Sequence, residues 1–549
     1  MRRRLETKSR TSLLALLVAL MMVVAACNGS GGGEEATTTA GESSDSTEAP
    51  ATTAPSEGEG ETTETTGGEA TSEGGVLEVA LLDDIDEFDP QAFSAVNFPI
   101  IKNIYDSLIE YTAEGEAIPW LATEWEINDD NTSVTLTLRD DVTFHSGEPL
   151  NSAAVAATFE KANDPELGKN LYSTMDIVDS WETPDDYTFV VNFKQPTAER
   201  QITDLLQFLS VIDPAGIDDV ATTPAGSGPF MLESRSLGSE LTLVANPNYW
   251  ADGPYLDAIH MTIFDDDDAA SAALESGQVD LIYNVSAREG LRLSEAGFNL
   301  VEGPGPLVQV LRINTNNGPL QNQTFRQGLA YILNREAILE VGYSGIGEVT
   351  VLPWAPASPA ADPSYNELYA YNPEKAQELF EQSGLSPEEM SDFTMLVNSG
   401  STQTVDISQL FQADLASVGI NIELELLEGA EYTDRLLQGE FDVLFGGIGN
   451  VQKFPTRVAT NSIYRTADNP VIGDPMFPEY VEAIERINTT LGPEEEIQAA
   501  YDNLNQVLMD LAFALPTNSY QFGLIVASPD LEGVELDIDN ILIGRTIRK

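Results

Sequence analysis

One order of elements occurs twice in this chain: a strand, a helix, a tight turn and a second strand. In both copies a helix ends near a leucine, a glycine and an aspartate follow at equal spacing, and an apolar strand begins. The matching residues are Leu274, Gly277, Asp280 and Leu281, and then Leu436, Gly439, Asp442 and Val443. Two similar α/β lobes would leave a cleft between them, and small-ligand sites preferentially lie between domains. Coincidence is the alternative, because many helices end at a glycine before a strand.

The length of the chain restricts its fold, and its charge restricts its possible partners. A chain of 549 residues exceeds the roughly 250 to 300 residues at which single cores stop growing, so more than one lobe is expected. The 90 acidic residues against 26 basic ones give a net charge of -64. This charge repels the phosphates of nucleic acids and anionic lipid head groups, so nucleic acid is not an expected partner.

The single cysteine, Cys27, excludes an internal disulfide and a cysteine-based zinc site. Before it come five basic residues within positions 2–10 and an apolar run, Ser12–Ala26, as in a secretory signal. The run is shorter than the ~20 residues of a membrane-spanning helix. It ends in Val-Ala-Ala-Cys, which resembles the lipobox of bacterial lipoproteins. We therefore expect a signal peptide at 1–26 and a lipid anchor on Cys27 at the extracytoplasmic face of the cell membrane.

Residues 27–75 consist mostly of Gly, Ser, Thr and acidic residues, and such a segment cannot bury enough apolar area to fold. It is expected to be a disordered linker. Order is expected to begin with a strand at Val76–Leu82, and alternating runs predict further strands at Ser133–Arg139 and Tyr187–Phe193. Helical spacing predicts helices at Ile100–Tyr111 and Asn151–Ala162.

Several segments of residues 76–549 resemble the family 5 extracellular solute-binding proteins, the receptors of peptide and nickel ABC importers. The resemblance rests on the order and spacing of the segments together. They are Phe88-Asp89-Pro90, Ile104–Leu108, Ile118–Glu126, Leu138–Leu150, Gly226–Phe230, Asn246–Trp250, Phe325–Tyr331 and Asn334-Arg335.

This resemblance implies a two-lobed α/β fold of the periplasmic-binding-protein-like type II, in the large cluster with an extra subdomain, joined by a two-strand hinge. It places lobe 1 at 76–307 with the subdomain at about 111–222, lobe 2 at 308–524, and a return to lobe 1 at 525–549. The outward crossing is expected near Val308–Asn314 and the return near Leu515–Ile525.

The implied function is the monomeric, substrate-binding lipoprotein of an ABC importer. It would capture a peptide or similar small solute between its lobes and deliver it to the membrane permease, with no cofactor, no metal and no catalysis. Two alternatives are a secreted hydrolase that uses paired carboxylates and a sensory solute receptor. No nucleophile elbow, P-loop or metal-ligand spacing supports an enzyme.

The candidate ligand-binding residues follow the strand that ends near Phe445. In peptide-binding relatives this segment adds to an extended ligand as a β-strand would, and glycines permit a close approach. The resemblance thus indicates Gly446, Gly447, Ile448 and Asn450. Trp354 is a further candidate, and the crossing segments add Asn314 and Tyr520.

Relatives that bind peptides commonly carry an acidic residue next, which pairs with the amino terminus of the peptide. Here the segment contains Lys453 and Arg457, which would suit an anionic group such as a carboxylate; the alternative is a surface loop. His145 and the run Asp265–Asp268 could suggest metal ligands. We interpret the histidine as structural and the aspartates as helix caps.

Overall fold

The computed structural model describes residues 74–92, 97–112, 115–303, 305–449, 451–460, 463–466, 469–472, 477–521 and 523–549. All of them belong to the unit Glu69–Lys549. The predicted signal peptide, Cys27, nearly all of the predicted linker, and Asn450 lie outside the described residues.

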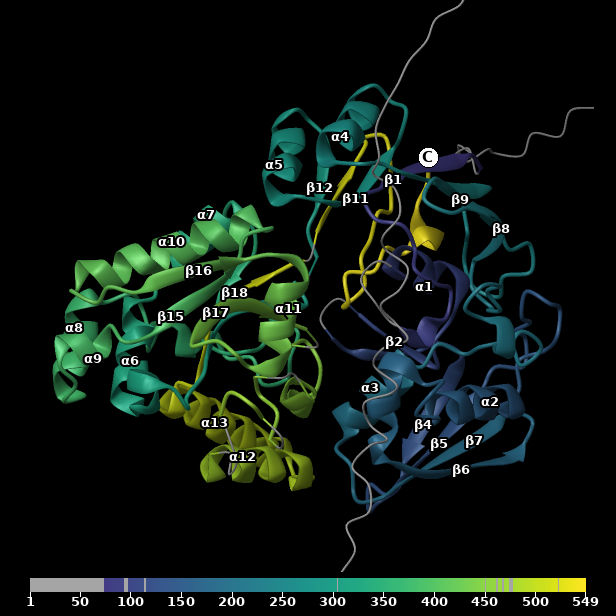
Figure 1. Cartoon of the computed structure of the whole chain (residues 1–549). Coiled ribbons are helices and arrows are strands. Elements are labelled where there is room, and N and C mark those ends of the chain that lie inside the picture. Colours follow the sequence, from purple (N-terminus) through teal and green to yellow (C-terminus); the bar gives the residue numbers. More distant parts are fainter. Residues whose placement is uncertain are drawn as a thin grey trace, which may run out of the picture. The chain divides into compact units, whose positions relative to one another are not determined.

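The first lobe, as named here, contains a mixed sheet (Figure 1). Within the described residues its strand order is β12-β19-β11-β1-β10-β9-β8. Their bounds, in that order, are Asn299–Val301, Leu524–Ala527, Leu281–Val285, Val76–Leu81, Ala258–Ile263, Glu240–Ala245 and Phe230–Ser236. One face packs on α1 (Phe98–Ile104), and α4 (Asp267–Glu275) and α5 (Ala287–Glu295) cover the other.

A second body of the first lobe is the sheet β4-β5-β7-β6. Its strands are Ala122–Ile127, Ser133–Leu138, Thr188–Phe193 and Val178–Asp185. Helices α2 (Ser152–Ala162) and α3 (Glu199–Phe208) pack on its apolar face. Strands β2 (Ile109–Tyr111) and β3 (Ala117–Pro119) pair with each other as an antiparallel hairpin beside this sheet.

The second lobe is built on a sheet of order β14-β18-β13-β17-β15-β16. Its strands are Glu348–Val349, Ala514–Tyr520, Leu307–Ile313, Val443–Ile448, Thr394–Asn398 and Glu423–Leu427. Five helices, α6 (Gln323–Ile332), α7 (Arg335–Tyr343), α8 (Pro373–Gln382), α9 (Pro387–Met390) and α10 (Thr402–Ser417), belong to one side. The other side holds α11 (Gly429–Gln438), α12 (Pro478–Thr489) and α13 (Glu494–Leu511).

The repeated motif has a common structural basis in the two lobes. Gly277 and Gly439 end their helices in the left-handed region, with φ of 73° and 70°, where a side chain would be strained. The aspartate that follows accepts a hydrogen bond from a backbone amide of a neighbouring parallel strand. Asp280 accepts a hydrogen bond from the Glu78 amide at 2.9 Å, and Asp442 accepts one from the Thr394 amide at 2.8 Å. The predicted internal repeat is therefore confirmed.

The chain passes from the first sheet to the second between Val301 and Leu307 and returns between Tyr520 and Leu524. The outward passage thus precedes the expected segment, Val308–Asn314. That segment lies inside the second sheet because β13 pairs with β17 and β18 along nearly its whole length.

The strand and helix predictions were mostly right, and one helix was predicted too long. Strands β1, β5 and β7 and helix α2 match their predicted positions, and the Asn151 side chain caps α2. The helix expected to continue to Tyr111 ends at Ile104. The carbonyl of Ile104 instead accepts from the Gly228 amide, and that of Asp106 accepts from the Val211 amide, both at 2.9 Å. Tertiary hydrogen bonds therefore replace the next helical turn.

Candidate functional site

The predicted site residues Gly446, Gly447 and Ile448 form the end of β17. The prediction that the strand ends near Phe445 was therefore wrong, because the glycines continue to pair with β13. On one side the three residues pair with β13, opposite Val310, Gln309 and Val308. On the other side β17 is paired with β15 at Val443 alone, within the described residues. The edge of Gly446–Ile448 that faces away from β13 therefore has no strand partner there, and such an edge can pair with an extended chain.

The two glycines allow large side chains to approach the strand on both faces. A Cβ atom at Gly446 would lie 2.9 Å from the Arg312 guanidinium, and one at Gly447 would collide with the Tyr520 hydroxyl. Arg312 also donates to the Gly447 carbonyl at 2.5 Å. Burial lowers the pKa of Arg312, and the nearby Tyr432, Tyr464 and Tyr520 act in the opposite direction. The structure thus brings Tyr520 to the glycines and adds Arg312, which sequence reasoning missed.

Trp354 and Asn314, two of the other predicted residues, make their hydrogen bonds inside the second lobe. Trp354 is buried in the second lobe, where its indole nitrogen donates to Asn505 at 2.7 Å. The Asn314 amide donates to the carbonyls of Gly439 and Phe441, at 3.2 and 2.9 Å. The polar groups of Trp354 and Asn314 therefore already have partners inside the lobe. Whether either residue contacts a solute stays a prediction.

The segment 451–457, which follows the site, contacts the first lobe through polar groups. The Phe454 amide donates to Asp204 at 2.7 Å, and Arg200 of α3 donates to the Gln452 carbonyl at 3.3 Å. Arg457 lies over the Phe208 ring at 5.3 Å, at the end of α3. The predicted site residue Arg457 is therefore part of a contact between the lobes.

Lys453 is the centre of this contact. Its side chain is fully buried, and its ammonium lies 3.0 Å from Asp539 and 2.9 Å from the Gln207 amide oxygen. Burial alone would raise the pKa of Asp539, but Lys453 and the hydrogen bonds from Gln207 and Gln452 lower it. The anionic partner expected for Lys453 is thus a carboxylate of this chain in the described structure.

The segment 116–469 matches the family model of the bacterial extracellular solute-binding proteins, family 5 Middle. The chain belongs to family 5. It is 25% identical to the nickel-binding periplasmic protein of Escherichia coli strain K12 over 474 residues, which cover 78% of this chain and 86% of that protein. It is 28% identical to a putative ABC transporter peptide-binding protein of Brucella ovis over 379 residues, covering 66% and 71% of the two chains.

A solved structure shows the same fold. The ABC transporter substrate-binding protein CtaP from Listeria monocytogenes superposes with a TM-score of 0.76 at 19% identity, over 86% of this chain and 99% of that one. The predicted α/β fold of the periplasmic-binding-protein type is therefore confirmed. The two relatives and this structure are named as nickel-binding, peptide-binding and substrate-binding proteins, so the hydrolase alternative has no support from them.

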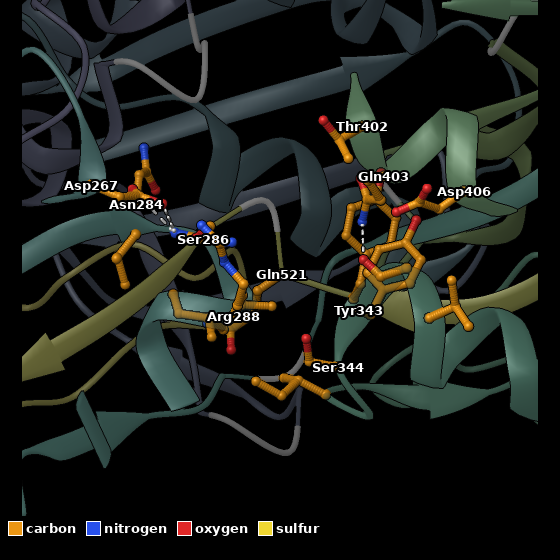
Figure 2. A pocket seen from close by; sticks show the side chains of 18 residues that line it. Asp267, Asn284, Ser286, Arg288, Tyr343, Ser344, Thr402, Gln403, Asp406 and Gln521 are labelled. Carbon is orange, nitrogen blue, oxygen red and sulfur yellow. Dashed lines mark hydrogen bonds between the residues drawn. The ribbon is translucent and has the colours of Figure 1, made fainter. Parts of the chain in front are cut away.

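A pocket of about 720 Å³ lies beside the segment between Tyr520 and Leu524, where this family 5 chain returns to the first sheet (Figure 2). Figure 2 shows Asp267, Asn284, Ser286 and Arg288 of the first lobe on one side, and Tyr343, Gln403 and Asp406 of the second lobe on the other. Tyr520 and Gln521 line it as well. On the side of the second lobe, α7 and α10 form the wall of this pocket. These two helices cover one face of the second sheet, whereas α12 and α13 cover the other face.

The residues that could suggest a metal site have structural roles. The imidazole Nε2 of His145 lies 3.0 Å from the Gly228 carbonyl, and burial lowers the pKa of this histidine. Asp266 caps α4 by accepting from the Ala269 amide at 2.8 Å, as predicted for this acidic run. Within the described residues no group of three or more His, Cys, Asp or Glu is placed to hold a metal ion.

In the same part of the chain, no helix is both long and apolar enough to cross a membrane.

Proposed function

We propose that this chain is the solute receptor of an ABC importer. It captures a peptide or similar small solute between its two lobes and presents it to the membrane permease, and it carries out no reaction on that solute. Membership of family 5 supports this proposal, as do a relative named as a nickel-binding periplasmic protein and one named as a putative ABC transporter peptide-binding protein.

The observation that carries the proposal is the strand edge at Gly446–Ile448 beside the segment that contacts the first lobe. An extended solute can add to this edge through backbone hydrogen bonds and touch the first lobe at the same time. A solute drives closure of the lobes when it makes better contacts in the closed state than in the open one. A strand edge beside the contact between lobes meets this requirement.

Thermal unfolding and small-angle scattering test the capture of a solute. An enzymatic casein hydrolysate is expected to raise the melting temperature and to lower the radius of gyration, because a ligand at 100 times its Kd adds ~2.7 kcal/mol. The variant Gly447→Val should lose both effects, because its side chain collides with Tyr520 at the binding edge. Leu237→Ala is the control, since Leu237 is 79% exposed. A pool of metal complexes is tested in the same way. If neither the hydrolysate nor this pool changes the melting temperature or the radius of gyration of the wild type, the proposal is wrong.

The proposal includes a lipid anchor on Cys27 that holds a monomeric receptor near its permease. It rests on the lipobox-like sequence before Cys27, and two acyl chains provide stable attachment where one does not. In a bacterial host the wild-type chain should be found in the membrane fraction and carry lipid detectable by mass spectrometry. Cys27→Ser should abolish both. Membrane attachment of the serine variant would contradict the anchor while leaving the capture proposal intact.

A further inference from the structure

The pocket in Figure 2 contains a buried amide donor without a partner. Gln521, where the chain returns to the first sheet, lines this pocket. Its Nε2 atom is buried and has no hydrogen-bond partner within the described residues. Such atoms are rare in folded proteins, because an unsatisfied buried donor costs free energy. This donor therefore indicates that an acceptor atom of a bound molecule completes the pocket.

A distortion at the end of β11 places a second amide in the same pocket. The register of β11 against β19 shifts between Tyr283 and Val285. Asn284, which lies between them, has a φ of 70°, and its side chain lines the pocket (Figure 2). A left-handed backbone is unfavourable for a residue with a side chain, and bulges and strained residues of this kind gather at functional sites. This end of β11 thus has the form of a binding segment.

An amide on the opposite wall supplies an acceptor. Gln403, near the start of α10 in the second lobe, donates through its Nε2 to the Gly342 carbonyl at 2.8 Å. This hydrogen bond orients the amide and leaves its oxygen as an acceptor. Figure 2 shows Gln403 across the pocket from Asn284. The pocket therefore offers a donor and an acceptor, and both are uncharged.

The charged residues of the pocket do not decide its chemistry. They are Asp267, Arg288 and Asp406. Arg288 and Asp406 have opposite signs and are exposed, so water and salt screen both charges. Asp267 accepts a hydrogen bond from the Ser286 amide at 3.4 Å. The buried group that a solute meets here is therefore the uncharged amide of Gln521.

The pocket adjoins the proposed binding edge through one side chain. Tyr520 lines the pocket, and its hydroxyl is the group that a Cβ atom at Gly447 would meet. The side chains of an extended solute point alternately to the two faces of the strand to which it adds. A solute side chain on the face of Tyr520 is therefore directed toward the pocket.

We propose that this pocket selects peptides that carry an uncharged carboxamide side chain, as in glutamine and asparagine. The inference rests on the proposed capture function and specifies which peptides are captured. A carboxamide both donates and accepts, so it can satisfy the Gln521 donor and the Gln403 oxygen together. A carboxylate only accepts, an ammonium only donates, and an apolar side chain does neither. Each of these leaves at least one of the two amides without a partner.

The test uses three pools of synthetic alanine peptides, three to five residues long, that contain one glutamine, one glutamate or one leucine. The peptide concentration that gives half of the shift in melting temperature is measured for each pool. It should be about 5- to 100-fold lower for the glutamine pool, the factor for a buried group that is otherwise left unsatisfied. Equal concentrations for the three pools would overturn the inference and leave solute capture intact. A shift with casein hydrolysate but none with the glutamine pool would have the same meaning.

A variant then tests the assignment to this pocket. Gln521→Leu should fold, because the Nε2 atom that it loses has no partner in the chain, and it should lose most of the preference for the glutamine pool over the leucine pool. Gln506→Leu is the matched control, since Gln506 donates to Asp510 on the exposed face of α13, and it should keep that preference. An unchanged preference in Gln521→Leu would overturn the role of this pocket. If no pool and no hydrolysate has an effect, the inference fails together with peptide capture.

Discussion

Two buried arginines fix the helical side of the second lobe through backbone carbonyls. Arg326, which is 1% exposed, donates to the carbonyls of Leu320, Gln321 and Leu511, at distances from 2.7 to 3.2 Å. Arg335 donates in the same manner to Pro516, Ala330 and Tyr369. The planar guanidinium can reach several carbonyls in fixed directions, whereas an ammonium is a point charge on a flexible stem. These arginines are therefore structural, although they are charged and belong to a recognised motif.

Replacing Arg326 by lysine should destabilise the second lobe although the charge is kept. We expect a loss of about 2 to 4 kcal/mol, because buried carbonyls lose their donors and a buried charge keeps fewer partners. The midpoint of urea unfolding, followed by tryptophan fluorescence, measures the effect. Arg486→Lys on the exposed face of α12 is the control and should change stability by less than about 0.5 kcal/mol. Equal midpoints for the two variants would contradict the structural role of Arg326.

Asp537 should make the stability of the solute-free protein depend on pH. Its pKa is raised to about 7 by burial and by Asp539, above the ordinary value of about 4 in the unfolded chain. Its stabilising contribution is therefore complete below about pH 4 and is lost as the pH rises through about 7. Between pH 5 and 8 the melting temperature of the wild type should fall more than that of Asp537→Asn. Parallel curves for the two proteins would show that this carboxyl group is ionised throughout.

At the scale of elements, the repeated helix, turn and strand differ in the space around the glycine. Gly277 has nothing within 4 Å of the position of a Cβ atom, whereas at Gly439 such an atom would lie 3.0 Å from Pro470 and 3.1 Å from Val471. Both glycines have a left-handed backbone. Replacing each glycine by alanine therefore measures two costs in free energy. At Gly277 it measures the cost of a left-handed backbone alone, and at Gly439 it adds the cost of crowding.

Gly277→Ala should destabilise its lobe by about 1 kcal/mol, the cost of a left-handed backbone for a residue with a side chain. Gly439→Ala should cost about 1 to 3 kcal/mol more, because the new methyl group must displace Pro470 and Val471. Calorimetric melting of the two variants measures the difference. A smaller effect at Gly439 than at Gly277 would mean that the loop at 469–472 moves freely.

Local sequence patterns predicted β5, from its alternation, and α2, from its helical spacing. The binding role of Gly446–Ile448 rested on the resemblance to the family and stays a prediction. Local patterns failed where distant segments decide the local structure. The end of α1 at Ile104 depends on amides of Val211 and Gly228, which lie more than 100 residues away in the sequence. Arg312 resembles an ordinary strand residue, and Asp537 is one acid among 90 acidic residues. Their surroundings arise from folding, so no local pattern could identify them.

At the scale of the whole described unit, a small number of polar contacts connects the segment 451–457 to the first lobe. One of them is the ion pair between Lys453 and Asp539, whose side chains are almost fully buried, at 0% and 2% exposure. Removing one partner of a buried pair typically costs about 3 to 5 kcal/mol, because the other charge stays buried without compensation. Inverting a two-state equilibrium from 1:99 to 99:1 requires about 5.5 kcal/mol. Loss of Lys453 alone would therefore change the free energy of lobe contact by an amount that approaches this value, because Asp539 would stay buried without a partner.

Lys453→Met should consequently favour separation of the lobes in the absence of solute. Separation would hydrate Asp539 and relieve its unpaired charge, whereas each lobe keeps its own core. Small-angle scattering should give a larger radius of gyration for Lys453→Met than for the wild type. Lys375→Met is the matched control, because Lys375 and Glu378 form an exposed pair within α8, and exposed pairs contribute little. If Lys453→Met keeps the wild-type radius and loses only melting temperature, the pair stabilises the fold without controlling the separation of the lobes.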